Sequence, residues 1–315
     1  MFIDRTHLLI LNYNGRALLE ECLPSVVEAA RRSRIPCRVS VVDNESSDDS
    51  CHWLEQTWPS IGLIHERNDG LASFNRVLQR LDEPIVLMLN NDIKLALDAL
   101  SPLYRPFEQQ ADALFTAPLC WTFDGREYEG MRTRVRSRYG LIQGMSRVPG
   151  YESEIRNNDL TAAAGPILAV DRRKFLEIGG YDPIFFPGRI EDLDLGFRGW
   201  MAGYRGYYIP ESVAYHRGFG TFAPAFGQAG CDRLALRNSL IFAWKNLSGP
   251  RLLDHLAWIP ARIVYGMAQG RYDFVIACFE ALKRLKQIRS SRRALAVGQG
   301  NWSKRQESFF RQFQW

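Results

Sequence analysis

Short apolar runs alternate with amphipathic stretches over the first hundred residues of the chain. Three runs have the composition of buried strands, at residues 8–11, 39–42 and 85–89. Apolar residues recur at helical spacing between them, over residues 17–33, 50–58 and, more weakly, 71–81. This alternation predicts an α/β fold with a mostly parallel central sheet and helices on both of its faces.

Beyond residue 112 the pattern changes twice. Residues 113–222 mix strand signals with Gly-rich turns, and the chain then becomes helical, with candidate helices at residues 231–246, 250–269 and 272–289. We therefore predict an α/β domain over residues 1–222, in two halves that meet at residue 112, and a C-terminal helical region over residues 223–315.

Polar side chains follow each of the three predicted strands. The strand ends continue into Asn12-Tyr13-Asn14-Gly15, Asp43-Asn44-Glu45-Ser46-Ser47 and Asn90-Asn91-Asp92. One such ending would be an ordinary helix cap or turn. Ligands of parallel sheets bind beyond the carboxyl ends of the strands, so three polar endings at one edge predict a binding site there.

The residue types at this edge suit a nucleotide and a metal ion. The carboxylate of Asp43 can accept hydrogen bonds from a nucleobase or a ribose, or it can cap the helix that starts near Ser50. Asp92 supplies a hard oxygen ligand of the kind that binds Mg²⁺ or Mn²⁺ beside phosphates. His216 follows a strand-like segment and can complete the shell of Mn²⁺, although a single histidine is more often structural.

A pair of adjacent acids, Glu191 and Asp192, begins the densest motif of the chain. Neighbouring side chains on a helix point about 100° apart, so only one of the two carboxylates can aim fully into a site. The alternative is an acidic first helical turn, which the helix dipole favours.

Composition restricts the classes of function. Of the 315 residues, 46% are apolar and 24% charged, as in folded globular chains. A net charge of +5 is modest for a nucleic-acid binder, so no nucleic-acid partner is predicted. Six scattered cysteines without CxxC spacing disfavour a zinc site or a disulfide scaffold. We find neither a secretion signal nor a run of about 18 apolar residues, and we expect cytoplasmic residence.

The C-terminal region combines apolar periodicity with basic residues. We predict peripheral contact with the anionic inner face of the cell membrane; packing on the α/β domain or a homodimer contact is the alternative. The residues concerned are Leu252, Leu253, Leu256, Ile259, Ile263 and Met267 at helical spacing, Trp258 and Tyr265 as interfacial aromatics, and Lys283, Arg284, Lys286, Arg289, Arg292 and Arg293. A second basic cluster, at residues 132–138, can hold a phosphate of a substrate or form a solvated surface.

The joint order of the motifs is specific. The segments that carry it are Ile10-Leu11-Asn12-Tyr13-Asn14-Gly15, Val41-Val42-Asp43-Asn44-Glu45-Ser46-Ser47-Asp48, Asn68-Asp69-Gly70-Leu71-Ala72, Leu89-Asn90-Asn91-Asp92, Gly179-Gly180-Tyr181-Asp182, Glu191-Asp192-Leu193-Asp194-Leu195 and His216. Over roughly residues 6–222 the chain resembles the family 2 glycosyltransferases of the GT-A fold, and in particular the bacterial rhamnosyltransferase-like enzymes of surface polysaccharide synthesis.

The resemblance implies an inverting, metal-dependent transfer of a sugar. The donor would be a deoxythymidine or uridine diphosphate sugar, with rhamnose as the leading candidate for the sugar, and the acceptor a saccharide or a lipid-linked saccharide. Residues 1–112 would bind the nucleotide sugar, and residues 113–222 would form the acceptor and catalytic half. The implied roles are catalytic for Asp192 and Glu191, metal-binding (Mn²⁺ or Mg²⁺) for Asp92 and His216, and donor-binding for Asn12, Tyr13, Asn14, Asp43, Asn68, Gly70, Asn90 and Asn91. One position departs from the family pattern: Asn90 replaces the first acid of the Asp-x-Asp motif.

Two other functions remain open at this point. A sugar-phosphate nucleotidyltransferase would also use a nucleotide-binding sheet and Mg²⁺, but it needs a Gly-rich, basic phosphate loop after its first strand, and Asn12-Tyr13-Asn14-Gly15-Arg16 supplies little of one. A catalytically inactive binding subunit is the second, and the joint presence of Asp92, Glu191, Asp192 and His216 argues against it.

Overall fold

The computed structural model describes residues 2–218, 222–296 and 301–315. Its central sheet has the strand order β10-β12-β6-β11-β4-β1-β2-β3, with β5 beside β12 and β7 beside β6. The strands are β1 (Thr6–Asn12), β2 (Cys37–Asp43), β3 (Gly62–His65), β4 (Ile85–Asn90), β5 (Ile93–Leu95), β6 (Ala113–Thr122), β7 (Tyr128–Gly130), β10 (Asp159–Leu160), β11 (Ile167–Asp171) and β12 (Arg205–His216), and a separate hairpin pairs β8 (Arg134–Arg138) with β9 (Leu141–Met145).

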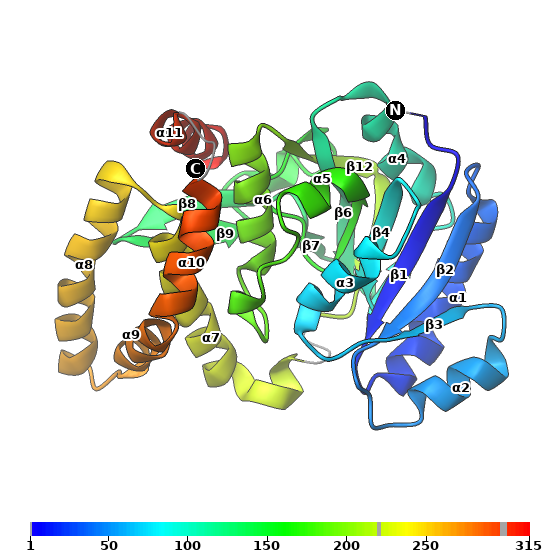
Figure 1. Cartoon of the computed structure of the whole chain (residues 1–315), viewed down its shortest axis with the longest axis horizontal. Coiled ribbons are helices and arrows are strands. Elements are labelled where there is room, and N and C mark those ends of the chain that lie inside the picture. Colours follow the sequence, from blue (N-terminus) through cyan, green and yellow to red (C-terminus); the bar gives the residue numbers. More distant parts are fainter. Residues whose placement is uncertain (1, 219–221, 297–300) are drawn as a thin grey trace.

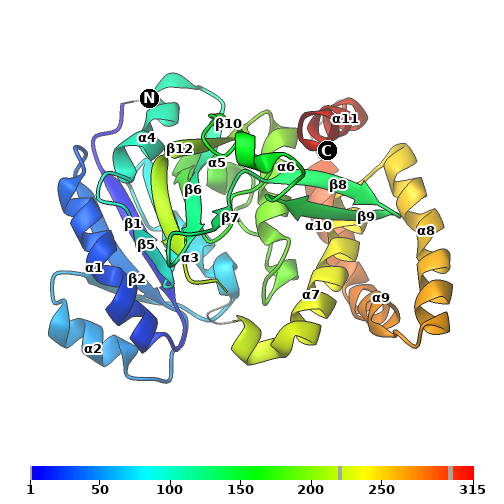
Figure 2. The same cartoon turned by 180° about the vertical axis from the view of Figure 1, so that it is seen from behind.

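Helices cover both faces of the sheet. One face carries α1 and the other α3 and α5, as Figures 1 and 2 show from opposite sides. The helices are α1 (Arg16–Arg32), α2 (Ser50–Thr57), α3 (Ser73–Gln79), α4 (Leu100–Gln109), α5 (Arg172–Glu177), α6 (Glu191–Ala202), α7 (Phe222–Asn246), α8 (Gly249–Ala268), α9 (Asp273–Lys283), α10 (Leu285–Ala296) and α11 (Trp302–Phe313). The predicted α/β fold is confirmed, with its parallel strands β4-β1-β2-β3 in register.

The sheet is not parallel throughout. Strand β11 is antiparallel to both of its neighbours, β4 and β6, and β12 is parallel to β6. The carboxyl ends of β1, β2, β4, β6 and β12 consequently share one edge, and β11 begins at that edge. Local periodicity did not predict that β11 lies antiparallel between β4 and β6. An antiparallel strand that is buried on both faces has the same apolar composition as a parallel one.

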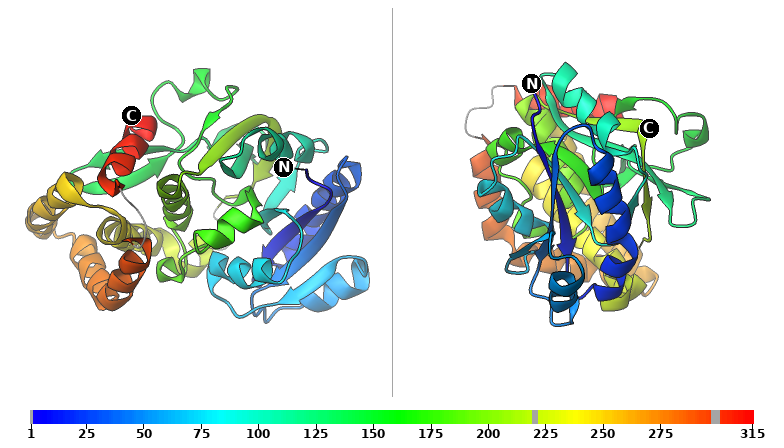
Figure 3. Two further views of the ribbon diagram at one scale, coloured as in Figure 1. Left: turned by 45° about the horizontal axis from the view of Figure 1, so that its top comes forward. Right: turned by 90° about the vertical axis from the view of Figure 1, so that its right-hand side faces the viewer.

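A second apolar core joins the C-terminal helices to the middle of the chain. Phe197 of α6 packs edge-to-face on Phe309 of α11, with ring centroids 5.0 Å apart, and on Phe242 of α7 at 5.5 Å. These helices form one end of the molecule, and the parallel strands lie toward the other (Figures 1 and 3). The division at residue 222 stays a prediction.

The predicted helix at residues 272–289 is two helices, since α9 ends at Lys283 and α10 begins at Leu285. In α8, Leu252, Ile259 and Ile263 pack against the second core, whereas Leu253, Leu256 and Met267 are exposed. Within the described ranges, no helix is both long enough and apolar enough to cross a membrane.

Candidate active site

A cavity of about 890 Å³ lies at the shared carboxyl edge of the strands. Its walls come from the end of β4, from β7, from the β8–β9 hairpin, from the residues before β11, and from α6 and α7. The lining includes Asn90, Asp92, Glu129, Arg136, Gln143, Gly165, Arg189, Glu191, Asp192, His216, Asp232 and Ser239. The topology thus brings four of the predicted metal and catalytic residues, 92, 191, 192 and 216, into one cavity.

The turn between β4 and β5 places Asp92 against His216. Strand β5 pairs antiparallel with the end of β12, with Ile93 opposite His216. The Nε2 atom of His216 lies 3.4 Å from Oδ2 of Asp92. The other carboxylate oxygen of Asp92, Oδ1, is buried and has no hydrogen-bond partner among the described residues. A buried acceptor without a partner is costly, which makes this atom a candidate ligand for a bound cation.

Glu129 lies on the opposite edge of the same imidazole ring. Its Oε1 atom is 3.1 Å from Nδ1 of His216, so each ring nitrogen faces a carboxylate. Burial by itself would lower the pKa of His216, but hydrogen bonds to Asp92 and Glu129 outweigh it and raise that pKa to about 9. The patterns in the sequence did not indicate Glu129. One signal was present: Asp124-Gly125 is a dipeptide typical of hairpin turns. The turn that it forms lets β7 pair antiparallel with the carboxyl end of β6, which places Glu129 there.

The two adjacent acids begin α6 and line the same cavity. Burial, followed by repulsion from Asp192, raises the pKa of Glu191 to about 8, and burial raises the pKa of Asp192. Oε2 of Glu191 is buried without a hydrogen-bond partner in the part of the chain that the structure describes. Arg189 and Ile190, directly before the helix, adopt positive φ angles of 78° and 73°. Positive φ is strained for such side chains and is concentrated at functional sites.

Asp194, two residues after Asp192, has a structural role. It is fully buried and accepts hydrogen bonds from Arg198 of the same helix and from Lys245 and Asn246 of α7. Lys245 also pairs with Asp182 at 2.7 Å. This network fixes α6, and with it Glu191 and Asp192, against α7 and the loop before α6.

The Gly-Gly-Tyr loop before that network is held from α3. The side-chain amide of Asn75 donates to the carbonyl of Tyr181 at 2.7 Å and accepts from the amide N–H of Tyr181 at 2.9 Å. A Cβ atom at Gly180 would meet the Asn75 side-chain oxygen at 2.2 Å. The positive φ of 62° and this close approach explain why a glycine stands at position 180.

Asp43 lies at the end of β2, outside the lining of the cavity. Its Oδ2 atom accepts the backbone N–H of Ser46 at 3.2 Å, so it forms a turn and does not cap α2. Its buried Oδ1 has no hydrogen-bond partner within the described residues. Ligand atoms of Asp43, Cys51 and His65 all lie within 4.8 Å of one another. Burial and the charge of Asp43 raise the pKa of Cys51 to about 11, so it is a thiol at neutral pH and a weak metal ligand.

The other predicted donor-binding residues also lie along this edge. Asn90 lines the cavity. Asn91 donates to Asn12 at 2.7 Å, and both are buried. Asn14 accepts from the backbone N–H of Ser47, while Tyr13 is exposed. The structure therefore separates Asn90 from the other amides of these two strand ends.

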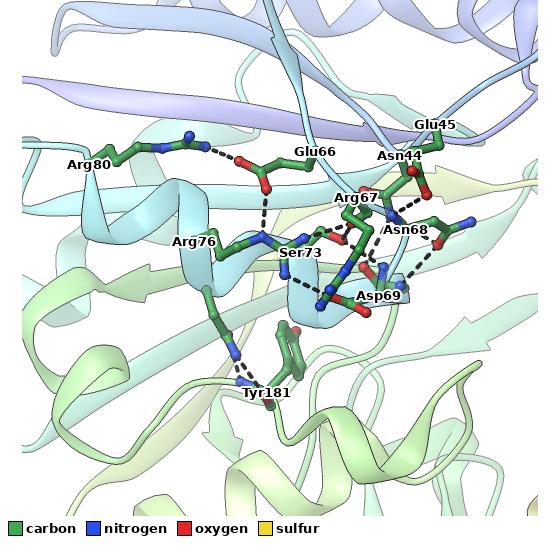
Figure 4. A network of polar contacts seen from close by, with 12 residues as sticks. Asn44, Glu45, Glu66, Arg67, Asn68, Asp69, Ser73, Arg76, Arg80 and Tyr181 are labelled. Carbon is green, nitrogen blue, oxygen red and sulfur yellow. Dashed lines mark hydrogen bonds and ion pairs between the residues drawn. The ribbon is translucent and has the colours of Figure 1, made fainter.

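The loop that follows β3 is ordered by polar contacts (Figure 4). Asn68 accepts from the N–H of Gly70 and donates its own backbone N–H to Glu45. Glu66 pairs with both Arg76 and Arg80. These contacts place Asn68 and Gly70 beside Asn44, next to Asp43 at the end of β2.

The basic segment before β9 divides its charges between two environments. Arg132 and Arg134 pair with Asp159. Arg136 instead lines the cavity, where it donates to Gln143 at 3.1 Å. Carboxylates of the protein therefore neutralise the first two arginines of this cluster, and Arg136 is the one that lines the cavity.

The family described as Glycosyl transferase family 2 matches residues 8–176 of the chain. An N-acetylglucosaminyl-diphospho-decaprenol L-rhamnosyltransferase of Mycobacterium tuberculosis is 26% identical over 234 residues, which are 65% of this chain and 74% of that protein. N-acetylgalactosaminyltransferase 7 of Drosophila melanogaster is 23% identical, over 69% of this chain and 40% of that protein.

Solved structures of similar fold include three with a bound nucleotide or nucleotide sugar. GalNAc-T7 with UDP, GalNAc and Mn²⁺ has a TM-score of 0.57 at 19% identity and covers 77% of this chain and 48% of its own. A mannosyltransferase of Pyrobaculum calidifontis with GDP-Man and Mn²⁺ has a TM-score of 0.53 at 18% identity, over 94% of this chain and 86% of that chain. S. aureus TarS 1-349 with UDP-GlcNAc has a TM-score of 0.56 at 13% identity, over 98% of this chain and 89% of that chain. These likenesses show the GT-A fold.

Proposed function

The chain belongs to glycosyl transferase family 2, and we propose that it is an inverting, metal-dependent enzyme that moves a sugar from a nucleoside diphosphate to a hydroxyl of a saccharide or lipid-linked saccharide. The observation that carries the proposal is the composition of the cavity. Asp92 and His216 are in contact, and they line the same cavity as Glu191 and Asp192 at the start of α6. A metal-held diphosphate and a proton acceptor for the attacking hydroxyl need such an arrangement.

The residues around Asp92 fit a divalent cation. They offer a carboxylate with one unpaired, buried oxygen and an imidazole nitrogen 3.4 Å from the other oxygen. Mn²⁺ or Mg²⁺ accepts such oxygen and nitrogen donors, and its binding would release the proton that His216 carries at neutral pH. When bound, the cation would offset the negative charge that grows on the departing diphosphate. Glu129 holds the far side of the imidazole ring and so orients Nε2 toward the ligand position.

Asp192 takes the acceptor proton as the hydroxyl oxygen attacks the anomeric carbon. The attack forms the new glycosidic bond while the bond to the diphosphate breaks, so the configuration inverts and no covalent sugar–enzyme intermediate forms. Glu191 keeps a proton to higher pH than an ordinary glutamate, and it therefore suits hydrogen-bond donation to the acceptor or to Asp192. We assign the base to Asp192 because Glu191, protonated at neutral pH, cannot accept a proton there.

The donor nucleoside lies, in this proposal, at the ends of β1 and β2. The unpaired Oδ1 of Asp43 would accept an N–H of the base, which a thymine or uracil ring provides. Relatives that transfer rhamnose and bind UDP support a deoxythymidine or uridine diphosphate sugar, with rhamnose as the leading candidate. Thermal stabilisation by a panel of nucleotide sugars with Mn²⁺ would identify it, since a bound ligand raises the unfolding temperature.

Two substitutions test the division of roles. Asp192→Asn keeps the shape of the side chain but cannot accept a proton, so turnover should fall roughly 10²–10⁴-fold while nucleotide binding persists. Asp92→Asn should weaken nucleotide binding that depends on Mn²⁺. Calorimetry with the nucleoside diphosphate, with and without Mn²⁺, separates the two effects, and Asp82→Asn, an exposed acid outside the cavity, is the control.

Three outcomes would count against this assignment. Loss of nucleotide binding in Asp192→Asn, with normal binding in Asp92→Asn, would reverse the roles. Normal turnover in both variants would place the active site elsewhere. Nucleotide binding by the wild type without transfer or hydrolysis of any donor in the panel would favour an inactive binding subunit, and formation of a nucleotide sugar from a sugar phosphate would favour a nucleotidyltransferase.

A further inference from the structure

The outer side of α8 and α9 is an unusually apolar surface. Several large apolar side chains there are more than half exposed, with Leu253, Val264 and Tyr265 at 67% and Phe279 at 64%. The remaining large apolar side chains of this surface are Leu256, Trp258, Met267, Tyr272, Ile276 and Leu282. Contiguous apolar patches on exposed helices mark interaction sites. We call these ten residues the outer apolar face.

Helix α8 is apolar on its outer side as well as on the side that packs against the protein. Its inner stripe, which includes Leu252, Ile259 and Ile263, packs on the second core. The exposed positions are also apolar from Leu253 to the end of the helix, apart from Asp254. A helix that only covered the core would carry polar residues on its outer side.

The segment that carries the outer apolar face is strongly basic. Residues 249–296 contain nine Lys or Arg and three Asp or Glu, which gives +6, whereas the whole chain carries +5. Arg284 and Arg292 donate to backbone carbonyls of neighbouring elements. The exposed cations of this segment are Arg271, Lys283, Lys286, Arg289 and Arg293.

We propose that the outer apolar face docks on the surface of an anionic lipid bilayer. Apolar side chains enter the interface, tyrosine and tryptophan lie at headgroup level, and neighbouring cations meet anionic headgroups. Trp258, Tyr265 and Tyr272 supply the aromatic residues. A twofold contact between two copies would instead bring two segments of +6 together, since such a contact pairs the same surface with itself. Charge therefore favours lipid over a second chain.

The β8–β9 hairpin connects this surface to the cavity. Arg136 and Gln143, the central pair of the hairpin, line the cavity, and in its turn Tyr139 packs on Trp258 of α8, with ring centroids 5.1 Å apart. Figure 2 shows the hairpin extending toward α8. Arg136 lies in β8, and Tyr139 follows three residues later in the turn of the hairpin. On the basis of the proposed function, an acceptor held in the bilayer by a lipid would enter the cavity along this hairpin.

The test compares binding of the full chain to vesicles of phosphatidylcholine, alone or mixed with phosphatidylglycerol. The wild type should co-sediment with the mixed vesicles, and salt should weaken the binding. Val264→Glu with Phe279→Glu should reduce binding at least tenfold, because each charge would enter the interface. Lys286→Gln with Arg289→Gln should reduce it about fivefold for each cation removed, and only on the anionic vesicles.

Matched controls separate docking from loss of fold. Phe2→Glu with Leu97→Glu changes two exposed apolar residues outside the C-terminal helices and should bind as the wild type does. All variants should keep the wild-type unfolding temperature, because the changed side chains are exposed. Transfer to a soluble acceptor should also stay normal, so a failure of docking is distinguishable from a failure of the proposed function.

Two results would overturn the docking proposal. The first is equal binding to vesicles by the wild type and the Val264→Glu, Phe279→Glu variant, including the case in which neither binds. The second is a wild-type dimer, measured by light scattering, that this variant alone converts to a monomer, since a second copy would then cover the outer apolar face.

Discussion

Substitution of Asp194 by asparagine tests whether the acidic start of α6 contains a structural carboxylate two residues from the proposed base. Asp194 has no exposed surface. Both of its oxygens accept from Nζ of Lys245 at 2.8 Å, and one also accepts from Nε of Arg198 at 2.7 Å. Asn246 donates to the same carboxylate at 2.7 Å. Three side chains from two helices therefore depend on one negative charge.

The structure sets the expected size of the effect. Asp194 and Asp182 balance Lys245 and Arg198 in a buried cluster. Asp194→Asn leaves a net positive charge in this cluster. The N–H₂ group of the new amide also faces N–H donors of Arg198, Lys245 and Asn246, with which it cannot form hydrogen bonds. Removal of one partner of a buried ion pair costs about 3–5 kcal/mol, out of a total stability of about 5–15 kcal/mol for a folded domain. The variant should lose a large share of its stability.

Urea unfolding followed by tryptophan fluorescence measures this loss. Glu28→Gln is the matched control, because Glu28 pairs with Arg32 at 2.8 Å with both side chains at least 40% exposed, and such surface pairs contribute about 0–1 kcal/mol. Asp194 does not line the cavity, so the folded variant should still bind nucleotide. A loss no larger than that of the control would refute the structural role of Asp194.

Two further predictions concern the cavity. Glu129→Gln should reduce Mn²⁺ affinity about 10–100-fold, because the carboxylate that orients His216 is lost; calorimetry with Mn²⁺ alone checks it, and unchanged affinity would remove Glu129 from the site. Burial raises the folded-state pKa of Glu191 from 4.5 to about 8, so the folded state loses stability as pH rises between those values. Glu191→Gln should therefore stabilise the protein near pH 8 and much less near pH 5, as measured by thermal unfolding, and identical gains at both pH values would contradict the raised pKa.

Local sequence patterns predicted the residues that stand at strand ends. Asp92 and His216 follow apolar strands, and parallel register delivers such residues to one sheet edge whatever the loops between them do. The same logic placed Asp43 and Asn90 at that edge. It did not distinguish a side chain that lines the cavity from one that holds a loop. Asn90 and Asn91 are adjacent and identical in type, but successive side chains at a strand end point to opposite sides, so Asn90 lines the cavity and Asn91 bonds to Asn12.

Contacts between distant segments could not be predicted in this way. Glu129 reaches His216 from a strand of three residues, which is too short for periodicity to reveal. Asp194 meets Lys245 across 51 residues of sequence, and nothing near either residue specifies the other. On α8, apolar positions occur all around the helix, so the pattern could not tell the stripe that packs on the core from the outer apolar face.

The charge of the cavity explains why a cation and the donor belong together in the proposed function. Its lining contains five acids and three cationic side chains. The acids are Asp92, Glu129, Glu191, Asp192 and Asp232, and the cations are Arg136, Arg189 and His216, whose pKa of about 9 keeps it protonated at neutral pH. A diphosphate brought into this surface would meet repulsion from carboxylates held in a partly desolvated space. Protonation of Glu191 removes one of these charges at neutral pH, and burial raises the pKa of Asp192 as well. A divalent cation held by Asp92 and His216 would replace the single charge of the protonated His216 with two, and donor affinity should therefore follow Mn²⁺ occupancy in the calorimetric comparison of wild type and Asp92→Asn.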